Sequence, residues 1–451
     1  MHDVGIEGGV VVGPRGPRAV NVYVIGERIA EITREMRPAR TRIPADGLLV
    51  MPGMVDLHVH LMDPSAMERE DFPSGTAAAA RAGVTSIVEH SHAGPVRSVA
   101  DLEAKRRYLA HRSRVDYGLA AHAWPDRIAN VPSLWAAGVT FVKVFTCTTH
   151  GVPGFGPAAL LDLFRVACTA DALSLVHCED GSITEVAEER LRSAGRSDPG
   201  VLPDWRSREA ELVSLAMTGA LARTTGARIM AAHVSDVPAL EVIERDRRAG
   251  GQIGIETCPQ YLSLFENEVL DQGALRKFTP PARARTADDL DAMWDALARG
   301  RFTHVSTDHA PSTLAQKRSG DFWSVHFGLP GLDTTLSVLL DAAARGKISY
   351  ERIVDAYSRT PARLIGLYPR KGRLGVGSDA DVVLVDPAAR WTVRSTDLHS
   401  KAGWSPYEGR TLIGRAVATF LRGQLVADDR GQLAPPGTGR WLPGPGTAMT
   451  A

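Results

Sequence analysis

The chain has 451 residues, and its 52 basic and 52 acidic side chains give a formal net charge of zero. Hydrophobic residues make up 44% of the chain and charged residues 23%, as in a globular protein with a large core. The sequence has no basic tail or basic stripe, which excludes nucleic acid and anionic membranes as expected partners. No apolar stretch approaches the roughly 20 residues that a membrane-spanning helix needs.

The start of the chain and its cysteines bear on the cellular compartment. Residues 1–12 lack a basic segment followed by a long apolar run, so we expect no secretory signal. The four cysteines have no paired spacing and are too few for a disulfide scaffold: they are Cys147, Cys168, Cys178 and Cys258. We therefore expect a cytoplasmic protein.

Three zones follow one another along the chain. Residues 1–50 consist of short apolar runs and turns, which predict strands. Residues 51–365 alternate short apolar runs with helical patterns. Residues 366–451 return to strand-and-turn character and end in an irregular tail rich in Gly and Pro. We expect the two terminal zones to form one small β-sandwich domain and the middle zone to form a separate domain.

The middle zone contains eight apolar runs, which in chain order read VDLHVH, VTSIVEH, DYGLAAHAW, VTFVKVF, LSLVHCE, RIMAAHVS, QIGIETC and FTHVSTDH. Helical patterns separate them. Between the last two runs, Thr286 and Asp289 have the spacing of a capping box, and Gly300 stands where a helix would end. Eight strands that alternate with helices predict an α/β fold, a (β/α)8 TIM barrel.

Two histidines stand at the end of the first run. His58 and His60 are two residues apart, and that spacing puts both side chains on one face of a strand. Two neutral imidazoles on one face are suitable ligands for zinc or a similar metal. Taken alone, the pair is equally compatible with two polar residues at a strand end.

Lys143 lies inside the apolar run FVKVF, where a buried ammonium would be costly. Burial favours the neutral amine, which reacts with CO2 to form a carbamate. That reaction replaces a cation by an anionic group whose two oxygens can bridge two metals. The alternative is a lysine that extends to the barrel rim or pairs with a carboxylate.

Three further polar side chains stand at or near the ends of later apolar runs: His177, His233 and Asp308. With His58, His60 and Lys143 they make six candidate ligands on five of the eight strands, each at the C-terminal end. Barrel active sites are built at that end, whereas unrelated polar residues would be scattered. The combination predicts a metal site, in which the Asp308 carboxylate can also move a proton.

The motifs that carry these residues resemble those of the cyclic amidohydrolases, a family that includes dihydroorotase, allantoinase, hydantoinase and dihydropyrimidinase. The matching segments are PGMVDLHVHLMDP, VKVF, LVHCED, AAHVSD, ETCPQYL, FTPPAR, STDHAP, FGLPGLDT and TPARLIGLYPRKG. The resemblance extends from about residue 45 to residue 425. It implies hydrolysis of a C–N bond in a small cyclic amide, and homodimers or homotetramers.

The resemblance also implies roles for individual residues. His58 and His60 would hold a first divalent ion with Lys143 and Asp308, and His177 and His233 would hold a second. The ions are expected to be zinc, and Lys143, carboxylated on its side-chain nitrogen, would bridge them. Asp308 would accept a proton from the attacking water and pass it to the leaving ring nitrogen. Backbone groups near Thr279 and Phe327 match positions that clamp a cyclic imide.

Departures from the family pattern concern the substrate. Met62 stands where dihydroorotases usually have an arginine for the substrate carboxylate. His90 and His92 replace a Met-Pro-Asn-like stretch of dihydroorotases and allantoinases, and they either contact substrate or fill a polar rim. Thr148 stands where hydantoinases have a tyrosine. We therefore count Met62, His90, His92 and Thr148 among the expected substrate contacts.

Several functions remain open at this point. A hydantoin- or dihydropyrimidine-type ureide or imide is the first expectation for the substrate, allantoin is the alternative, and dihydroorotate fits less well. A one-metal ring deaminase would keep the histidines and Asp308 without needing Lys143. A dihydropyrimidinase-like protein without catalytic activity is disfavoured because all six candidate ligands are present.

Overall fold

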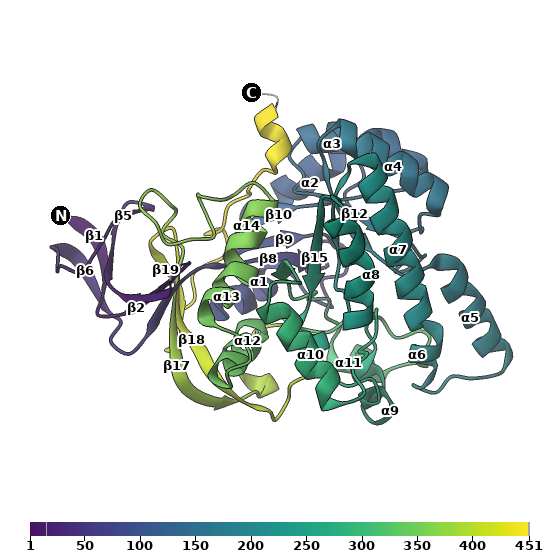
Figure 1. Ribbon diagram of the computed structural model, residues 1–451. Coiled ribbons are helices and arrows are strands. Elements are labelled where there is room, and N and C mark those ends of the chain that lie inside the picture. The colour runs from purple at the N-terminus through teal and green to yellow at the C-terminus, as the bar shows by residue number, and fades with distance from the viewer. Residues whose placement is uncertain (15, 450–451) are drawn as a thin grey trace.

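The structure, a computed structural model, describes residues 1–14 and 16–449. Figure 1 shows strands at the centre of the larger part, with helices packed around them, and a second group of strands beside it. No helix in the described part of the chain has the length and the apolar character needed to cross a bilayer.

Each of the eight predicted apolar runs contains a parallel strand, and the third run is split by Ala120. The strands are β8 (Met54–Val59), β9 (Val84–Glu89), β10 (Asp116–Leu119) with β11 (Ala121–His122), β12 (Val142–Phe145), β13 (Leu173–His177), β14 (Arg228–Ala231), β15 (Ile253–Thr257) and β16 (His304–Val305). Apart from Arg228 at the start of β14, they are buried along their lengths, as expected for parallel strands covered on both faces.

The parallel strands form two sheets that adjoin at both ends. One has the order β10-β9-β8 and the other the order β11-β12-β13-β14-β15-β16. At Ala120 the chain passes from one sheet to the other: its N–H donates to Glu89, and the next N–H, of Ala121, donates to Phe141. At the opposite ends, a parallel bridge joins Val59 of β8 to His309, just after β16.

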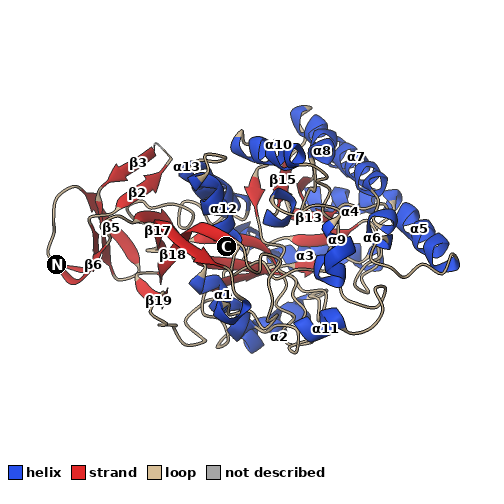
Figure 2. Cartoon of the chain, turned by 90° about the horizontal axis from the view of Figure 1, so that it is seen from below, coloured by secondary structure: helices blue, strands red, loops and turns tan. Residues whose placement is uncertain are grey.

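Helices connect these strands and cover them on the outside, which Figure 2 shows from a second direction. They are α1 (Phe72–Arg81), α2 (Val99–Leu109), α3 (Val131–Ala136), α4 (Pro157–Thr169), α5 (Gly181–Ser193), α6 (Val201–Trp205), α7 (Arg208–Thr225), α8 (Val237–Arg248), α9 (Glu268–Gln272), α10 (Ala287–Ala298), α11 (Leu314–Arg318), α12 (Thr335–Ala344), α13 (Tyr350–Val354) and α14 (Thr360–Leu364). The capping box predicted from Thr286 and Asp289 is present at the start of α10. Gly300 has a φ of 75°, which suits glycine just beyond a helix end.

Strands from both terminal zones form two further sheets. One has the order β5-β4-β1-β6 and the other the order β19-β18-β17-β7-β2-β3. Their strands are β1 (His2–Glu7), β2 (Val10–Gly13), β3 (Gly16–Ala19), β4 (Asn21–Ile25), β5 (Arg28–Thr33), β6 (Ala39–Pro44), β7 (Leu49–Pro52), β17 (Val382–Thr392), β18 (Thr411–Leu421) and β19 (Gln424–Asp428). Both sheets contribute to one apolar cluster, in which Val22 and Val24 of β4 pack with Val382 and Leu384 of β17.

The Gly- and Pro-rich tail packs against the parallel strands. Trp441 bridges to Tyr117 of β10, and the N–H of Leu442 donates to the carbonyl of Tyr117 at 2.7 Å. Farther along, the N–H of Gly444 donates to the carbonyl of Gly138 at 2.8 Å. The tail is therefore held by backbone hydrogen bonds, although it is largely irregular.

A buried ion network joins β10 to the region before β17. The Lys371 ammonium lies 2.8 Å from Asp116, 2.6 Å from Asp381 and 3.3 Å from Asp379. Burial lowers the pKa of Lys371, and the surrounding carboxylates outweigh this effect and raise it. Removal of the cation would leave the buried Asp381 carboxylate without a counter-charge, whereas Asp116 and Asp379 also contact arginines.

We expect Lys371→Met to lower the free energy of unfolding by about 3–5 kcal/mol, as when one partner of a buried ion pair is removed. Urea denaturation monitored by circular dichroism measures the change. Lys347→Met is the control, because Lys347 contacts Asp291 at 2.6 Å on the exposed surface, and such pairs contribute at most about 1 kcal/mol. Equal effects of the two substitutions would contradict the assigned role of the network.

Candidate metal centre

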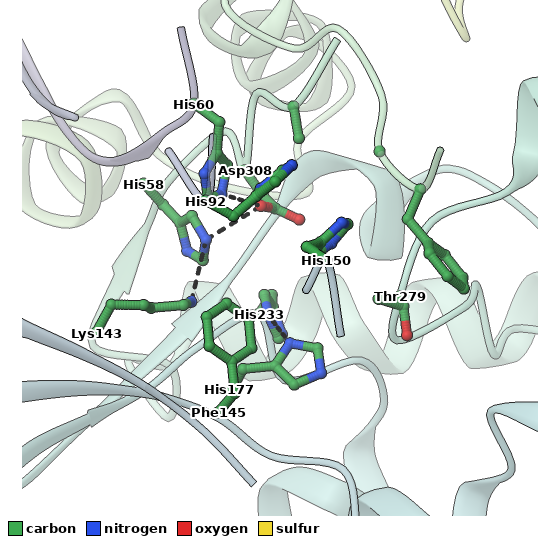
Figure 3. A pocket seen from close by; sticks show the side chains of 13 residues that line it. His58, His60, His92, Lys143, Phe145, His150, His177, His233, Thr279 and Asp308 are labelled. Atoms are coloured by element: carbon green, nitrogen blue, oxygen red, sulfur yellow. Dashed lines mark hydrogen bonds and ion pairs between the residues drawn. The ribbon is translucent and has the colours of Figure 1, made fainter. Parts of the chain in front are cut away.

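The six candidate ligands meet in one cavity, although they come from strands far apart in the sequence (Figure 3). His58 lies in β8, Lys143 in β12 and His177 at the end of β13, while His60, His233 and Asp308 lie in the loops that leave β8, β14 and β16. The cavity is lined by His58, His60, His92, Lys143, Phe145, His150, His177, His233, Thr279, Asp308, Ala310, Phe327 and Gly328. It therefore opens at the carboxyl ends of the parallel strands.

The first group of side chains surrounds the Asp308 carboxylate. Its Oδ1 lies 3.1 Å from His58 Nε2 and 3.6 Å from His60 Nε2. Lys143 Nζ lies 3.4 Å from the same His58 Nε2. The two-residue spacing in β8 thus brings two imidazoles to one carboxylate and one lysine.

The second group consists of His177 and His233. Nδ1 of His177 lies 2.9 Å from Nε2 of His233. The other ring nitrogen of His177, Nε2, lies 2.8 Å from the Glu179 carboxylate and donates to it. This hydrogen bond leaves the Nδ1 lone pair of His177 directed at His233.

Backbone strain is concentrated around these groups. Met62, His150, His233 and Asp308 have φ values of 58°, 52°, 37° and 48°, in the left-handed region that side chains other than glycine rarely adopt. Such residues cluster at functional sites, where the surrounding structure holds them in place. Here the strained conformations fall in the loops beyond the strand ends, two of them at candidate ligands.

The donor set is suited to divalent metal ions. Burial lowers the pKa of His60 to about 4 and lowers that of His233 well below its usual range, so both imidazoles are neutral near pH 7. Neutral imidazole is the form that binds metal. Nδ1 of His60 and Nδ1 of His233 are buried without a hydrogen-bond partner in the described structure. Four imidazoles and one carboxylate are a ligand set that zinc and related ions accept.

The environment of Lys143 favours its neutral amine. Its side chain is 1% exposed, and burial lowers its pKa to about 8. The Asp308 and Glu256 carboxylates act in the opposite direction and only partly restore it. The neutral amine is therefore more populated near neutral pH than in an exposed lysine, and carbamate formation requires this form.

Glu256 is a functional candidate that sequence reasoning missed. Its carboxylate accepts from Nδ1 of His58 at 2.7 Å and from the N–H of His233 at 3.0 Å. The bond to Nδ1 fixes the His58 tautomer and leaves Nε2 free for a ligand. Burial and Lys143 lower the pKa of His58, but Glu256 and Asp308 outweigh them and raise it. The available signal was a charged residue inside the apolar run QIGIETC.

We expect Glu256→Gln to weaken zinc binding by about 10- to 100-fold, because the substitution removes the charge that orients and polarises His58. Competition with a fluorescent chelator measures the affinity. Glu189→Gln is the matched control, since Glu189 lies exposed on α5. Unchanged affinity in the folded Glu256→Gln variant would show that this carboxylate does not support the site.

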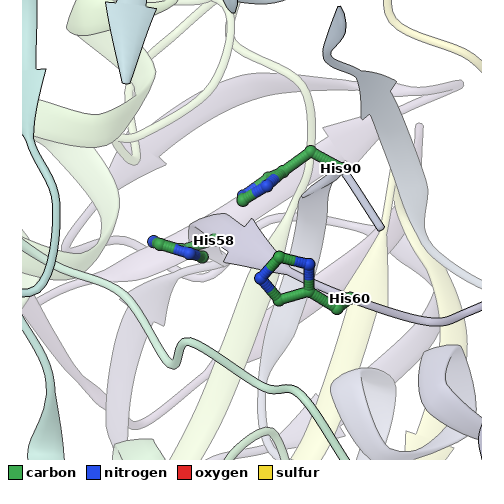
Figure 4. Close-up of side chains that lie close together, drawn as sticks. All are labelled: His58, His60 and His90. Carbon is green, nitrogen blue, oxygen red and sulfur yellow. The ribbon is translucent and has the colours of Figure 1, made fainter. Parts of the chain in front are cut away.

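Two other clusters of potential ligands lie close by. His58, His60 and His90 come together in one (Figure 4), with the His90 ring centroid 4.6 Å from that of His58. Both nitrogens of His90 lack a partner in the described structure. The other cluster joins Cys147, His177 and Glu179, but the Arg206 guanidinium lies 3.3 Å from Glu179 and disfavours a cation there.

The expected substrate contacts separate into two sets. His92, Thr279 and Phe327 line the cavity, whereas Met62, His90 and Thr148 do not. Met62 is buried beside Ser91, whose hydroxyl accepts its N–H at 2.8 Å, and the Thr148 side chain is exposed.

His150 lines the cavity in place of Thr148, and sequence reasoning missed it. The loop after β12 turns back on itself through a bridge between Thr149 and Val152, which carries His150 inward. Its ring stacks on that of His92, with centroids 4.1 Å apart (Figure 3). Burial lowers the pKa of His150 well below its usual range, so this ring is neutral.

Comparisons with known proteins agree with this site. The model of the amidohydrolase family matches residues 49–426. The chain is 33% identical to an allantoinase of Deinococcus radiodurans over 94% of this chain and 95% of the relative. It is 34% identical to a dihydroorotase of Halobacterium salinarum over 84% and 86% of the two chains.

A solved structure with the same fold is an L-hydantoinase (dihydropyrimidinase) from Arthrobacter aurescens. It superposes with a TM-score of 0.94 at 27% identity, over 98% of this chain and 100% of that one. The family match covers most of the chain, and both relatives exceed 30% identity over more than two thirds of it. The chain therefore belongs to the amidohydrolase family.

Proposed function

We propose that the protein hydrolyses a C–N bond in the ring of a small cyclic amide, such as a hydantoin- or dihydropyrimidine-type ureide or imide. The observation that carries this proposal is the convergence of four imidazoles, Lys143 and Asp308 in one buried cavity. The names of the relatives support it, because allantoinase, dihydroorotase and hydantoinase all open cyclic amides.

We also propose that residues 51–365 form a (β/α)8 barrel and that residues 1–50 and 366–451 form a β-sandwich beside it. The parallel pairing that adjoins at Ala120 and again at Val59 and His309 supports the barrel. The apolar cluster shared by the two remaining sheets supports the sandwich. The cysteine pattern supports a cytoplasmic location, and the family resemblance supports a homodimer or homotetramer.

Two divalent ions, expected to be zinc, fit the ligand set. His58, His60 and Asp308 would hold one, His177 and His233 would hold the other, and a carboxylated Lys143 would contact both. When bound, such ions supply a water of lowered pKa and polarise a substrate carbonyl.

The chain's own groups would move the proton and orient the ligands. Burial raises the pKa of Asp308, but His58 and His60 outweigh this effect and hold it well below its usual range, so the carboxylate is ionised and can accept a proton. It lies at the centre of the first group, where it would accept a proton from the attacking water and pass it to the leaving ring nitrogen. Hydrolysis adds the hydroxyl of water to the carbonyl carbon and the remaining proton to the ring nitrogen as their bond breaks.

Glu179 would hold His177 in its ligand orientation. Burial raises the pKa of this carboxyl, but Arg206 and His177 outweigh burial and lower it to about 2, so Glu179 is ionised. Its Oε2 also accepts from the Thr279 hydroxyl at 2.6 Å. This contact connects the second histidine group to a residue that lines the cavity.

A panel of cyclic amides tests the proposal with purified chain, first stripped of metal and then reconstituted with zinc and bicarbonate. Hydantoins, dihydropyrimidines, allantoin, dihydroorotate and cyclic imides are incubated and analysed by chromatography. We expect metal-dependent consumption of at least one ring class. No consumption by folded, zinc-loaded protein of any member would overturn the proposal.

A further inference from the structure

Three cations lie buried beside the cavity without an acidic partner. Arg69, Lys277 and Lys317 are 2%, 0% and 2% exposed. Within the described structure, no carboxylate oxygen lies at ion-pair distance from any of them. A buried cation without a counter-charge is unfavourable by several kcal/mol or more, so this arrangement calls for a specific reason.

The two lysines stand directly behind the part of the wall made by Phe327 and Gly328. The Lys277 ammonium lies 4.6 Å from the centroid of the Phe327 ring. Each ammonium donates to backbone carbonyls, Lys277 to those of Phe322, Trp323 and Val325, and Lys317 to those of Lys277 and His326. These bonds fix the loop and satisfy the donors, but they add no negative charge.

Arg69 contacts the cavity wall itself. Its Nε donates to the carbonyl of Pro311 at 3.0 Å, and its Nη1 lies 3.3 Å from Nε2 of His92, which lines the cavity. Its Nη2 is buried without a hydrogen-bond partner in the described structure. The hydrogen bonds to the loop explain why the two lysines are buried, but they do not explain the unpartnered Nη2 of Arg69.

The contact with Arg69 also determines which ring nitrogen of His92 carries the proton. A guanidinium can only donate, so Nε2 of His92 must accept, and the proton of the neutral ring must be on Nδ1. That Nδ1 is buried without a partner in the described structure. His92 therefore has a free N–H donor, and Arg69 has a free Nη2.

The pKa values of all three groups are lowered, mainly by burial, and no nearby carboxylate fully offsets this effect. Burial lowers the pKa of Arg69 to about 10 and that of Lys277 to about 8. Burial also lowers the pKa of Lys317 well below its usual range, and the charges of Lys277 and Arg69 lower it further. An anion bound at this wall would oppose all three shifts.

We infer that Arg69 and His92 bind an exocyclic carboxylate of the substrate, so that the preferred substrate is an acidic cyclic ureide rather than a neutral one. Arginine suits this task because its fork of donors matches the two oxygens of a carboxylate. The inference rests on the proposed hydrolysis and specifies its substrate class.

Matched substrate pairs test the inference with the zinc-loaded enzyme. Hydantoin-5-acetate is compared with hydantoin-5-acetamide, and dihydroorotate with its amide, so that each pair differs only in the charge of the side group. We expect kcat/KM for the acid of at least one pair to exceed that of its amide by about tenfold or more, as for a hydrogen bond to a charged group. Equal or better turnover of the amides would overturn the inference while leaving the hydrolytic function intact.

Substitutions of Arg69 test whether this residue causes the preference for the acidic substrate. We expect Arg69→Gln to reduce the acid-to-amide ratio to below about threefold, and Arg69→Lys to restore part of it because the charge returns without the fork. Arg107→Gln is the matched control, since Arg107 lies exposed on α2, and it should leave the ratio unchanged. A folded Arg69→Gln variant with the full preference would overturn the assignment to this residue.

A binding measurement separates carboxylate recognition from turnover. Calorimetry on the metal-free chain compares hydantoin-5-acetate with hydantoin-5-acetamide, whose rings stay closed without metal. We expect the acid to bind more tightly to the unmodified chain, and expect this difference to diminish in Arg69→Gln. Equal affinities of the two compounds for the unmodified chain would count against an anion site.

Discussion

Replacing Asp308 by asparagine should lower kcat by roughly a thousandfold, because this carboxylate would act both as a ligand and as the proton carrier. Its Oδ1 lies within 3.6 Å of both His58 and His60. Asparagine preserves the size of the side chain and one oxygen but cannot accept the proton. Steady-state hydrolysis with the best substrate from the panel, together with metal analysis, measures the effect.

The matched control for this substitution is Asp288→Asn on the exposed first turn of α10. It should leave both kcat and metal content unchanged. An Asp308→Asn variant that retains its metal and a kcat within about tenfold of the unmodified protein would exclude Asp308 as the proton carrier.

Replacing Lys143 by alanine should reduce the metal content from two ions to at most one per chain. The same change should lower kcat by on the order of a thousandfold, as when one member of a catalytic unit is removed. In the proposed site, a carboxylated Lys143 would contact both metal positions. Metal analysis and hydrolysis assays on the same preparation give both readouts.

Lys347→Ala, on the exposed surface, is the control for loss of a lysine. Removal of bicarbonate before reconstitution should lower the activity of the unmodified chain, and adding it back should restore that activity. Full activity of Lys143→Ala with one metal per chain would instead favour a one-metal deaminase, in which this lysine has no role.

Much of the fold could be predicted from the pattern of apolar runs, because each parallel strand is buried on both faces and stands out as an apolar segment. The six candidate ligands could be grouped for a related reason. Each lies near or just beyond the carboxyl end of such a run, and the carboxyl ends of parallel strands lie together. The predicted membership of the cyclic amidohydrolase group within the amidohydrolase family is confirmed by the family match and the relatives.

The loops could not be predicted in the same way. Thr148 was expected at the substrate because it stands where hydantoinases have a tyrosine, but the loop that bridges Thr149 to Val152 leaves Thr148 exposed and carries His150 inward. His90 follows β9 and lies against the His58 ring outside the cavity lining. Spacing along a strand determines a side chain's face, whereas spacing along a loop does not.

Contacts between distant segments were also beyond prediction. Glu256 supports His58 across 198 positions of sequence, and no local pattern indicates which atom a buried carboxylate will meet. Arg69 contacts His92 through a geometry that two irregular loops produce together. Such pairs depend on the packing of the whole domain.

The identity of the product tests the central claim most directly. The zinc-loaded protein is incubated in ¹⁸O-labelled water with the cyclic amide that it consumes fastest, and the product is analysed by mass spectrometry with a parallel assay for ammonia. We predict an open-chain acid that has gained one water, carries the label in its new carboxylate and forms without ammonia. Release of ammonia with the ring intact would contradict hydrolysis of the ring amide.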